Sequence, residues 1–261
     1  MTPSDASVRV HADAELLAKS VAARLITRLV DAQAERGSAC VALTGGGIGT
    51  AVLREVATAP ARDAVDWRRL DVWWSDERFL PTGDAERNET AARSALLDHV
   101  NVDPERVHPM PAPGGSYGDD PAGGAQRYAS ALREAAGESA GFPRFDVCLL
   151  GVGPDAHVAS LFPDHSASRE EDQLAVALRD APKPPPQRVT LTFPVLRGAR
   201  EVWLVASGGE KADAVARSLD STAGGAHVPA AGARGSERTL LLVDRPAARK
   251  LPPAFTAPSV A

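Results

Sequence analysis

The segment GVGPDAHVASLFP, at residues 151–163, contains the side chain of this sequence that is best suited to acid–base chemistry. It follows an apolar run, FDVCLL at residues 145–150, and includes His157, one of only six histidines in the chain. A histidine in this setting has three interpretations: a hydrogen-bonded structural imidazole, a metal ligand, or the base of a hydrolytic reaction. The surrounding residues help to separate them.

The pattern around His157 favours a base. A zinc site needs three or four His, Cys or carboxylate ligands at recognisable spacings, whereas His157 and His165 are eight residues apart across a proline and both cysteines lie within apolar runs. Ser160 lacks the flanking glycines of a nucleophilic serine elbow. Asp155 stands two residues before His157, and a carboxylate beside an imidazole fixes its tautomer and stabilises the imidazolium. We therefore expect no metal and a histidine that activates water.

Three other polar motifs also begin where an apolar run stops. TGGG at 44–47 follows the run 39–43, SDER at 75–78 follows 70–74, and GGEK at 208–211 follows 201–206. Each motif has a structural interpretation beside the functional one. TGGG is either a phosphate cradle or a tight strand-to-helix turn. SDER is either an anion-binding cluster or a set of exposed ion pairs. Lys211 is either the counterion of a bound anion or a solvated lysine.

The functional interpretations all describe an anionic ligand. Glycines let a backbone approach an oxyanion, and the N–H groups at a helix N-terminus favour negative charge. Arg78 carries a guanidinium that can bind phosphate or carboxylate through two hydrogen bonds. Lys211 is expected in the first turn of a helix, where a cation opposes the helix dipole unless an anion lies beside it. Arg188, which begins the segment RVTLTF, is weak evidence by itself.

The elements that must position these motifs alternate along the chain. Apolar runs predict strands at residues 39–43, 70–74, 145–150, 188–193, 201–206 and 239–244, and helical spacing predicts helices at about 14–36, 49–58, 88–99, 125–136 and 209–219. Loops are expected at 110–124, at 182–186 and after residue 246. Apolar strands alternating with helices indicate an α/β fold with a mostly parallel sheet covered on both faces. The four polar motifs should then meet at the carboxyl ends of the strands, where such sheets bind ligands.

Composition limits the classes of protein that this chain can belong to. It has 261 residues, an apolar fraction of 44%, a charged fraction of 24% and a net charge of −5, which is typical of a globular domain and does not suggest a nucleic-acid surface. The sequence shows neither a signal peptide nor an apolar stretch near the roughly 20 residues of a membrane span. Cys40 and Cys148 suit a reducing, cytoplasmic setting. With no internal repeat or linker, we expect one domain over residues 1–261, its core at about 10–246 and its ends flexible.

The motifs taken together resemble a known family. TGGG, SDERFLP, RNETAARSALL, LLGVGPDAHVASLFP, RVTLTFPVL and GGEKADAV occur in the order and spacing of the 6-phosphogluconolactonases, which share a superfamily with glucosamine-6-phosphate isomerase/deaminase. The resemblance extends from about residue 10 to residue 246, and it is the combination of motifs that makes it specific. It implies a modified doubly wound α/β fold in a single domain, in agreement with the strand pattern.

The resemblance also implies an activity and a set of site residues. The activity is hydrolysis of 6-phospho-D-glucono-1,5-lactone to 6-phosphogluconate, a step of the oxidative pentose phosphate pathway, with a phosphosugar lactone as substrate and no cofactor. His157 would deprotonate the attacking water, and Asp155 would orient the His157 imidazole. The implied substrate-binding residues are Gly45, Gly46, Gly47, Asp76, Arg78, Arg188 and Lys211. The hydrogen-bond donors to the oxyanion are not assigned: the backbone of Gly151–Gly153 and a cationic side chain are both candidates. We expect a monomer or a weak homo-oligomer.

Phe162 separates the two branches of the superfamily. Deaminase-type sequences have Asn-Glu-Pro after the catalytic histidine, whereas this chain has Leu161-Phe162-Pro163. Ring opening and deamination need the additional carboxylate, while lactone hydrolysis needs only a base and oxyanion stabilisation. A glucosamine-6-phosphate deaminase is therefore disfavoured, and a non-catalytic phosphosugar-binding module is disfavoured by the intact Asp155/His157 pair.

Two positions depart from the family pattern. Ala156 replaces the glycine of the usual Asp-Gly-His, which would cost about 1–2 kcal/mol if that position requires a positive φ. Near the C-terminus the usual Pro-Ala-Ser is Pro229-Ala230-Ala231, so that a hydroxyl is lost. Neither change removes a group that the expected chemistry uses.

Overall fold

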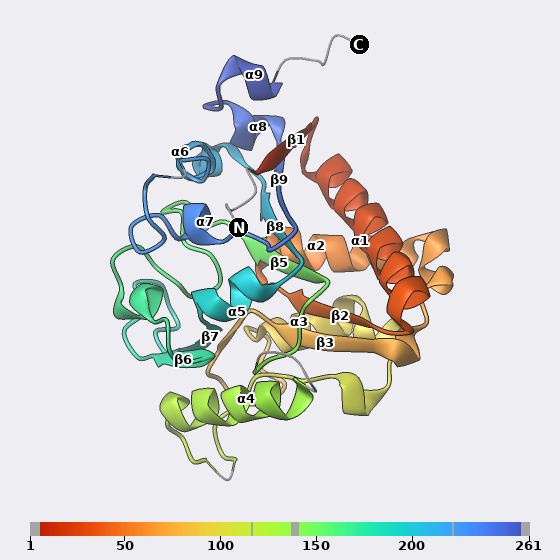
Figure 1. Ribbon diagram of the computed structural model, residues 1–261, viewed down its shortest axis with the longest axis vertical. Coiled ribbons are helices and arrows are strands. Elements are labelled where there is room, and N and C mark those ends of the chain that lie inside the picture. The colour runs from red at the N-terminus through yellow and green to blue at the C-terminus, as the bar shows by residue number, and fades with distance from the viewer. Residues whose placement is uncertain (1–5, 116, 137–140, 221, 257–261) are drawn as a thin grey trace.

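Six parallel strands form the central sheet, in the order β1-β9-β8-β5-β2-β3 (Figure 1). They span Ser7–His11 (β1), Ala39–Leu43 (β2), Leu70–Trp74 (β3), Val147–Gly151 (β5), Glu201–Ala206 (β8) and Arg238–Asp244 (β9). The computed structural model describes residues 6–115, 117–136, 141–220 and 222–256. All strands except β1 are almost wholly buried, which confirms the expected parallel sheet covered by helices.

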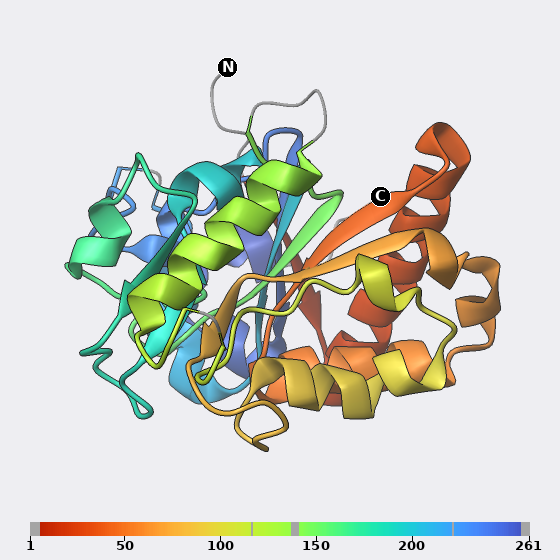
Figure 2. The same cartoon turned by 90° about the horizontal axis from the view of Figure 1, so that it is seen from below.

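Helices α1 (Ala14–Arg36) and α2 (Gly46–Thr58) pack against each other and against the central sheet, α1 on β2 and β9 and α2 on β5 and β8. Figures 1 and 2 show the two helices on the same side of the sheet. The first helix begins and ends as predicted. Asp13 accepts a hydrogen bond of 2.8 Å from the Leu16 N–H, and Gly37 ends the helix in the left-handed conformation with a φ of 78°.

A second sheet of three antiparallel strands, ordered β4-β7-β6, lies beside the first. Its strands are Asp76–Arg78 (β4), Ala175–Leu178 (β6) and Arg188–Leu191 (β7), and helix α4 (Pro121–Ala135) packs on β6 and β7. The sequence indicated a strand at 188–193 but not this separate sheet. Residues 179–187, between β6 and β7, contain no helix to make the crossover that parallel neighbours need, so the pair is antiparallel. Residue 193 instead begins helix α5 (Phe193–Gly198).

Ser75 alone separates β3 of the large sheet from β4 of the small one. Its N–H donates to the Leu43 carbonyl of β2 at 2.9 Å, and its carbonyl accepts from the Leu191 N–H of β7 at 2.9 Å. The chain therefore changes sheets through a residue that is hydrogen-bonded to both. Ser75 is fully buried.

Several expected boundaries were wrong. Helix α2 begins at residue 46 rather than 49, and α4 begins at residue 121 rather than 125 because Asp120 caps it ahead of Pro121. The glycines at 123 and 124 concealed that start, since glycine lowers helix propensity. The predicted helix 88–99 is α3 (Asn88–Ala95) followed by a 3₁₀ turn at Leu97–His99.

The short elements after residue 208, and the first strand of the chain, also differ from the prediction. The predicted helix 209–219 is a 3₁₀ turn at Gly209–Lys211 followed by α6 (Ala212–Arg217), and α7 (Pro229–Gly232) comes next. The segment after residue 246 contains most of α8 (Arg245–Ala248) and all of α9 (Pro253–Thr256), where only a loop was expected. Strand β1 was not predicted. The expected flexible ends fall partly on residues 1–5 and 257–261, which lie outside the described residues.

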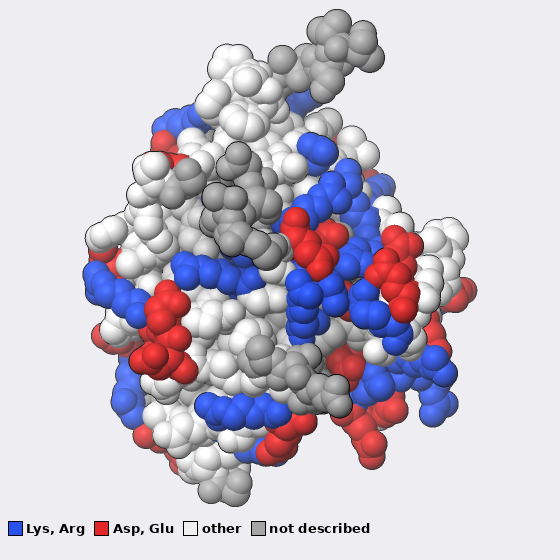
Figure 3. Space-filling view, viewed as in Figure 1, with Lys and Arg blue, Asp and Glu red and all other residues white. Residues whose placement is uncertain are grey.

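Charged side chains are interspersed on the face seen in Figure 3, with basic ones gathered on the side where α1 lies. Asp146, directly before β5, is paired with arginine side chains: Arg36 Nη2 is 2.5 Å and Arg200 Nε 3.5 Å from its Oδ1 atom. Asp146 therefore offsets arginine charge at the amino end of β5. No helix in the described ranges is long and apolar enough to cross a membrane.

The buried Tyr128 of α4 provides a test of how the second layer is attached to the sheet. Its hydroxyl accepts from the Trp74 N–H at 3.0 Å and donates to the Trp74 carbonyl at 3.1 Å. Tyr128→Phe should lower the free energy of unfolding by about 1–3 kcal/mol, because it leaves buried backbone groups without a partner. Urea denaturation measures the loss.

The matched control is Tyr117→Phe, since Tyr117 is partly exposed. Equal stabilities of the two variants would contradict a structural role for the Tyr128–Trp74 hydrogen bonds.

Candidate active site

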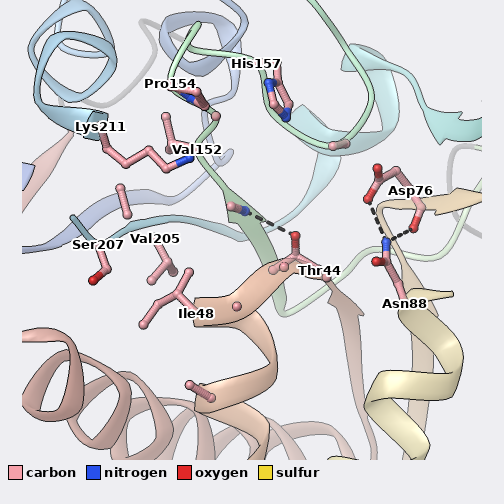
Figure 4. Close-up of a pocket in the computed structure, with 18 of the residues that line it drawn as sticks. Thr44, Ile48, Asp76, Asn88, Val152, Pro154, His157, Val205, Ser207 and Lys211 are labelled. Atoms are coloured by element: carbon pink, nitrogen blue, oxygen red, sulfur yellow. Dashed lines mark hydrogen bonds between the residues drawn. The ribbon is translucent and has the colours of Figure 1, made fainter. Parts of the chain in front are cut away.

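The four polar motifs meet in one cavity of about 880 Å³ at the carboxyl ends of β2, β5 and β8 and beside β4. In Figure 4, Lys211 extends into the cavity from one side, Asp76 and Asn88 lie on the opposite side, and His157 points in from the loop between them. All but one of the predicted site residues line it: Gly45, Gly46, Gly47, Asp76, Arg78, His157, Arg188 and Lys211. Asp155 stands behind His157. The expectation that these motifs converge is confirmed.

The turn Gly45–Gly47 leads from β2 into α2 and lines the cavity. The first N–H groups of a helix have no partner within it, and a glycine N-cap supplies no side chain to cover them. Gly45 is also required by space, because a Cβ atom there would lie 1.8 Å from the Asn88 Oδ1 atom. Thr44 fastens the turn to β5, since its hydroxyl accepts from the Gly151 N–H at 3.2 Å. The turn is therefore a rigid set of donors suited to an anion.

The imidazole of His157 is held by Asp155. Its Nδ1 atom lies 2.5 Å from the Asp155 Oδ1 atom, and its ring is 4.6 Å from the ring of Phe162. Gly153 makes room for the pair, because a Cβ atom there would lie 2.0 Å from His157 Nδ1. With Nδ1 turned to the carboxylate, the other ring nitrogen, Nε2, is left for the cavity that the histidine lines.

Ala156, between these two residues, has a φ of 71°. The position does require the left-handed region, so alanine carries a strain of about 1–2 kcal/mol there. The loop is held against this strain, because the Ala156 carbonyl accepts from the Ala230 N–H at 2.9 Å. The segment that replaces Pro-Ala-Ser is thus hydrogen-bonded directly to the loop that carries His157.

Lys183 is a residue of the site that the sequence did not indicate. It lies in the proline-rich loop 182–186 and lines the cavity. Its Nζ atom is 2.9 Å from Asp155 Oδ1 and 3.2 Å from His157 Nδ1. One signal was available: the chain contains only four lysines against many arginines, and two of the four, Lys183 and Lys211, line this cavity.

The wall opposite Lys211 is a buried polar network around Asp76. The carboxylate accepts from the Ser160 hydroxyl at 2.7 Å and from the Asn88 amide at 3.2 Å. Arg78 donates to the Asn88 Oδ1 atom at 2.5 Å. Asn88 and Ser160 were not predicted as site residues, although RNETAARSALL and VASLFP were among the motifs. Only the fold brings these distant segments to β4.

Arg188 lies in the cavity wall with most of its guanidinium engaged. It donates to the carbonyls of Lys183, Pro184 and Pro185 at 3.1, 3.2 and 3.1 Å. Its Nη1 atom is 3.4 Å from the Ser160 hydroxyl and 3.9 Å from Asp76 Oδ2. Burial lowers the pKa of Arg188, while Asp76 opposes the shift. Arg188 therefore holds the loop that carries Lys183 as well as facing the cavity.

Lys211 provides an unpaired cation. Asp244 fixes the turn before it by accepting from the Ser207 hydroxyl at 2.5 Å and from the Gly208 N–H at 3.1 Å. Burial lowers the pKa of the Lys211 ammonium, and Glu210 opposes the shift. Within the described part of the chain, no side chain or carbonyl forms a hydrogen bond or ion pair with this ammonium. An anion in the cavity would supply the missing partner.

The carboxylate of Asp155 is ionised at neutral pH. Partial burial raises its pKa, but the hydrogen bonds and charges of His157 and Lys183 outweigh burial and hold the pKa below its usual range. The backbone of Gly151–Gly153 is already engaged: its three N–H groups donate to Thr44 Oγ1, the Val205 carbonyl and the His157 carbonyl at 3.2, 3.2 and 2.9 Å. The N–H groups of this segment therefore already have protein partners.

Comparison of the sequence with known proteins identifies the family of this chain. The family model described as glucosamine-6-phosphate isomerases/6-phosphogluconolactonase matches residues 12–242. The chain belongs to this family. It is 56% identical over 254 residues to a 6-phosphogluconolactonase of Streptomyces coelicolor, covering 97% of both chains. It is 44% identical to the 6-phosphogluconolactonase of Mycobacterium tuberculosis, covering 94% of this chain and 98% of the relative.

Solved structures of the same family have a similar fold. The 6-phosphogluconolactonase of Trypanosoma brucei has a TM-score of 0.79 and 26% identity, covering 95% of this chain and 100% of that one. A monomeric glucosamine-6-phosphate deaminase has a TM-score of 0.74 and 21% identity, covering 94% of this chain and 99% of that one. The second likeness shows the fold alone. No cluster of three or more His, Cys, Asp or Glu that would hold a metal occurs among the described residues, and both cysteines are free.

Behind the cavity wall, the buried Glu77 ties β4 to α3. Its carboxylate accepts from the Arg78, Asn88 and Glu89 N–H groups at 2.8, 2.7 and 2.8 Å. Burial raises its pKa from 4.5 to about 7, although Arg87 and these hydrogen bonds oppose the shift. An acid with a raised folded-state pKa contributes stability below its unfolded pKa and loses it as the pH rises through the folded pKa.

Glu77→Gln should remove this pH dependence. The variant should be less stable than the wild type at low pH, because an amide N–H₂ would face a backbone donor. The deficit should then shrink as the pH rises from 4.5 to 7, the range between the two pKa values of the wild-type carboxyl. Urea denaturation at intervals across this range measures it. A deficit that is constant with pH would contradict the raised pKa.

Proposed function

We propose that the protein is a 6-phosphogluconolactonase that hydrolyses 6-phospho-D-glucono-1,5-lactone to 6-phosphogluconate. The observation that carries the proposal is the His157–Asp155 pair at 2.5 Å, which shares one cavity with the unpaired Lys211. The site thus supplies a base for water and a cation for a phosphate, two of the elements that hydrolysis of a phosphorylated lactone uses. The strong similarity to relatives named 6-phosphogluconolactonase supports it.

The proposed mechanism begins with water. His157 takes a proton from a water molecule through Nε2, and the water oxygen forms a bond to C1 of the lactone while the carbonyl electrons move to its oxygen. The tetrahedral intermediate then collapses: the C1–ring oxygen bond breaks, and the imidazolium donates its proton to the departing oxygen. Asp155, ionised and bonded to Nδ1, stabilises the imidazolium between these steps. The reaction uses side chains and water, with no metal or cofactor.

The substrate phosphate is proposed to lie between the Gly45–Gly47 turn and Lys211, with Arg78, Asp76 and Arg188 completing the wall. Helix α2 contributes unpaired N–H groups and the positive end of its dipole. Binding the remote phosphate holds the lactone ring in the orientation for attack. We further propose that residues 1–261 act as a single lactonase domain, in the cytoplasm, as a monomer or weak homo-oligomer.

The environment of His157 also favours hydrolysis over the deaminase alternative. Phe162 is 1% exposed and its ring lies 4.6 Å from the imidazole. This apolar ring stands where the sequence pattern of deaminases has a glutamate. A single base next to an apolar ring suits water activation, whereas deamination needs a further acid beside the histidine.

His157→Ala should abolish hydrolysis above the spontaneous rate, because no other histidine among the described residues lines the cavity. The rate is followed as acid release from freshly made 6-phosphogluconolactone, with spontaneous hydrolysis subtracted. His99→Ala is the matched control, since His99 is exposed on the far end of the 3₁₀ turn after α3. Activity of His157→Ala at the wild-type level would refute the mechanism, and ammonia release from glucosamine 6-phosphate would favour the alternative.

Lys211→Met should raise KM for the phosphorylated lactone by about 10- to 100-fold, the value of one lost hydrogen bond between charged groups. Hydrolysis of unphosphorylated glucono-1,5-lactone should be the same in the variant and the wild type. Steady-state kinetics with both lactones measure this. An equal loss on the two lactones would show that Lys211 does not bind the phosphate.

A further inference from the structure

We propose that Lys183 is a positioning residue for the His157–Asp155 pair, an inference that rests on the proposed lactone hydrolysis. Its role is to hold the Asp155 carboxylate so that this carboxylate takes the Nδ1 proton of His157 and Nε2 remains the base. Three atoms carry the inference: Lys183 Nζ, Asp155 Oδ1 and His157 Nδ1 lie within 2.5 to 3.2 Å of one another.

Hydrogen-bond donors and acceptors decide which nitrogen of His157 carries the proton. An ammonium has only donors and an ionised carboxylate has only acceptors. Nδ1 therefore bonds to Asp155 only when it carries the proton, and to Lys183 only when it does not. The contact to Asp155 is 2.5 Å and the contact to Lys183 is 3.2 Å, so the protonated Nδ1 is favoured. Lys183 then donates to Asp155 Oδ1 at 2.9 Å.

Lys183 also holds the carboxylate of Asp155 in place. The side chain of Asp155 is 34% exposed, and its Oδ1 atom receives hydrogen bonds from His157 and Lys183. Without the ammonium, this carboxylate would be free to rotate toward water, because only the imidazole would retain it. Lys183 thus fixes the oxygen of Asp155 that faces Nδ1, and together with His157 it favours the ionised carboxylate.

The loop that carries Lys183 is itself held in place. The guanidinium of Arg188, whose residue is 5% exposed, donates to the carbonyls of Lys183, Pro184 and Pro185. The Ala181 N–H closes the loop by donating to the Pro186 carbonyl at 3.1 Å. A lysine on a mobile loop would contact any one carboxylate only briefly. The hydrogen bonds of this loop instead hold the Lys183 ammonium beside Asp155.

Lys183 and Lys211, the two lysines that line the cavity, differ in their partners. Lys211 has no protein partner in the described ranges and is open to a ligand anion. Lys183 makes its contacts with the catalytic pair instead. The two lysines should therefore affect different kinetic constants, Lys211 the binding of the phosphate and Lys183 the rate of the chemical step.

The test is a double-mutant cycle of Lys183→Met and Asp155→Asn, with kcat and KM measured for the phosphorylated lactone. Lys183→Met should lower kcat by about 10- to 100-fold, the value of one lost hydrogen bond between charged groups, and leave KM near the wild-type value. In the Asp155→Asn background the same change should have no further effect on kcat, because its target is gone. Lys183→Arg, which keeps a cationic donor, should recover part of the loss.

Three outcomes would overturn the proposal. An unchanged kcat would show that Lys183 does not position the pair, a raised KM with unchanged kcat would place it on the phosphate, and fully multiplicative losses in the cycle would show that it acts independently of Asp155. Lys250→Met, a change to an exposed lysine paired with Asp213, is the control. If the wild type shows no rate above spontaneous hydrolysis, the proposed function fails instead.

A second readout does not depend on activity or on the behaviour of one variant. The nitrogen chemical shifts of the His157 imidazole, measured by NMR near neutral pH, report which ring nitrogen carries the proton. The wild type and Lys183→Arg should show a protonated Nδ1 and an unprotonated Nε2, while Lys183→Met should show a mixture of tautomers. The same tautomer in all three proteins would contradict the proposed role.

Discussion

Parallel strands bring their carboxyl ends to one edge of a sheet, and the site of this protein depends on that constraint. Four turns leave β2, β3, β5 and β8 at the same edge and line one cavity. None of these turns is close to another in sequence. A buried parallel sheet requires crossover connections, so residues such as Gly45, Asp76, His157 and Lys211 are brought together by strand order and by nothing local.

Within that cavity, charges are arranged so that some are satisfied by the protein and others are left for a ligand. Asp155 is matched by His157 and Lys183, and Asp76 by Ser160 and Asn88. A half-buried cation without a partner costs desolvation energy, which a bound anion would recover. The distribution of partners therefore distinguishes the groups that organise the site from those that are open to a ligand.

Much of this was accessible from the sequence, and the limits have physical causes. Strands such as 39–43 and 201–206 were predicted closely because a run buried on both faces is apolar throughout. His157 and Asp155 were predicted as a pair because they are two residues apart, and the structure places them in contact. Lys183, Asn88 and Ser160 were missed because their partners are distant in sequence: Lys183 lies 28 residues from Asp155. The second sheet was missed because β4 has only three residues, all of them charged.

Ser75 has a consequence for how the cavity admits its substrate. The large sheet supplies one wall of the cavity and β4 of the small sheet another, and the only residue between them bonds to both β2 and β7. Hinge closure needs a few residues that absorb large changes in φ and ψ, and a fully buried residue with both backbone groups engaged is not one of them. The two walls should therefore keep their spacing through the catalytic cycle. A fixed spacing of this kind would limit a ligand by its size, with no closing motion of the two sheets.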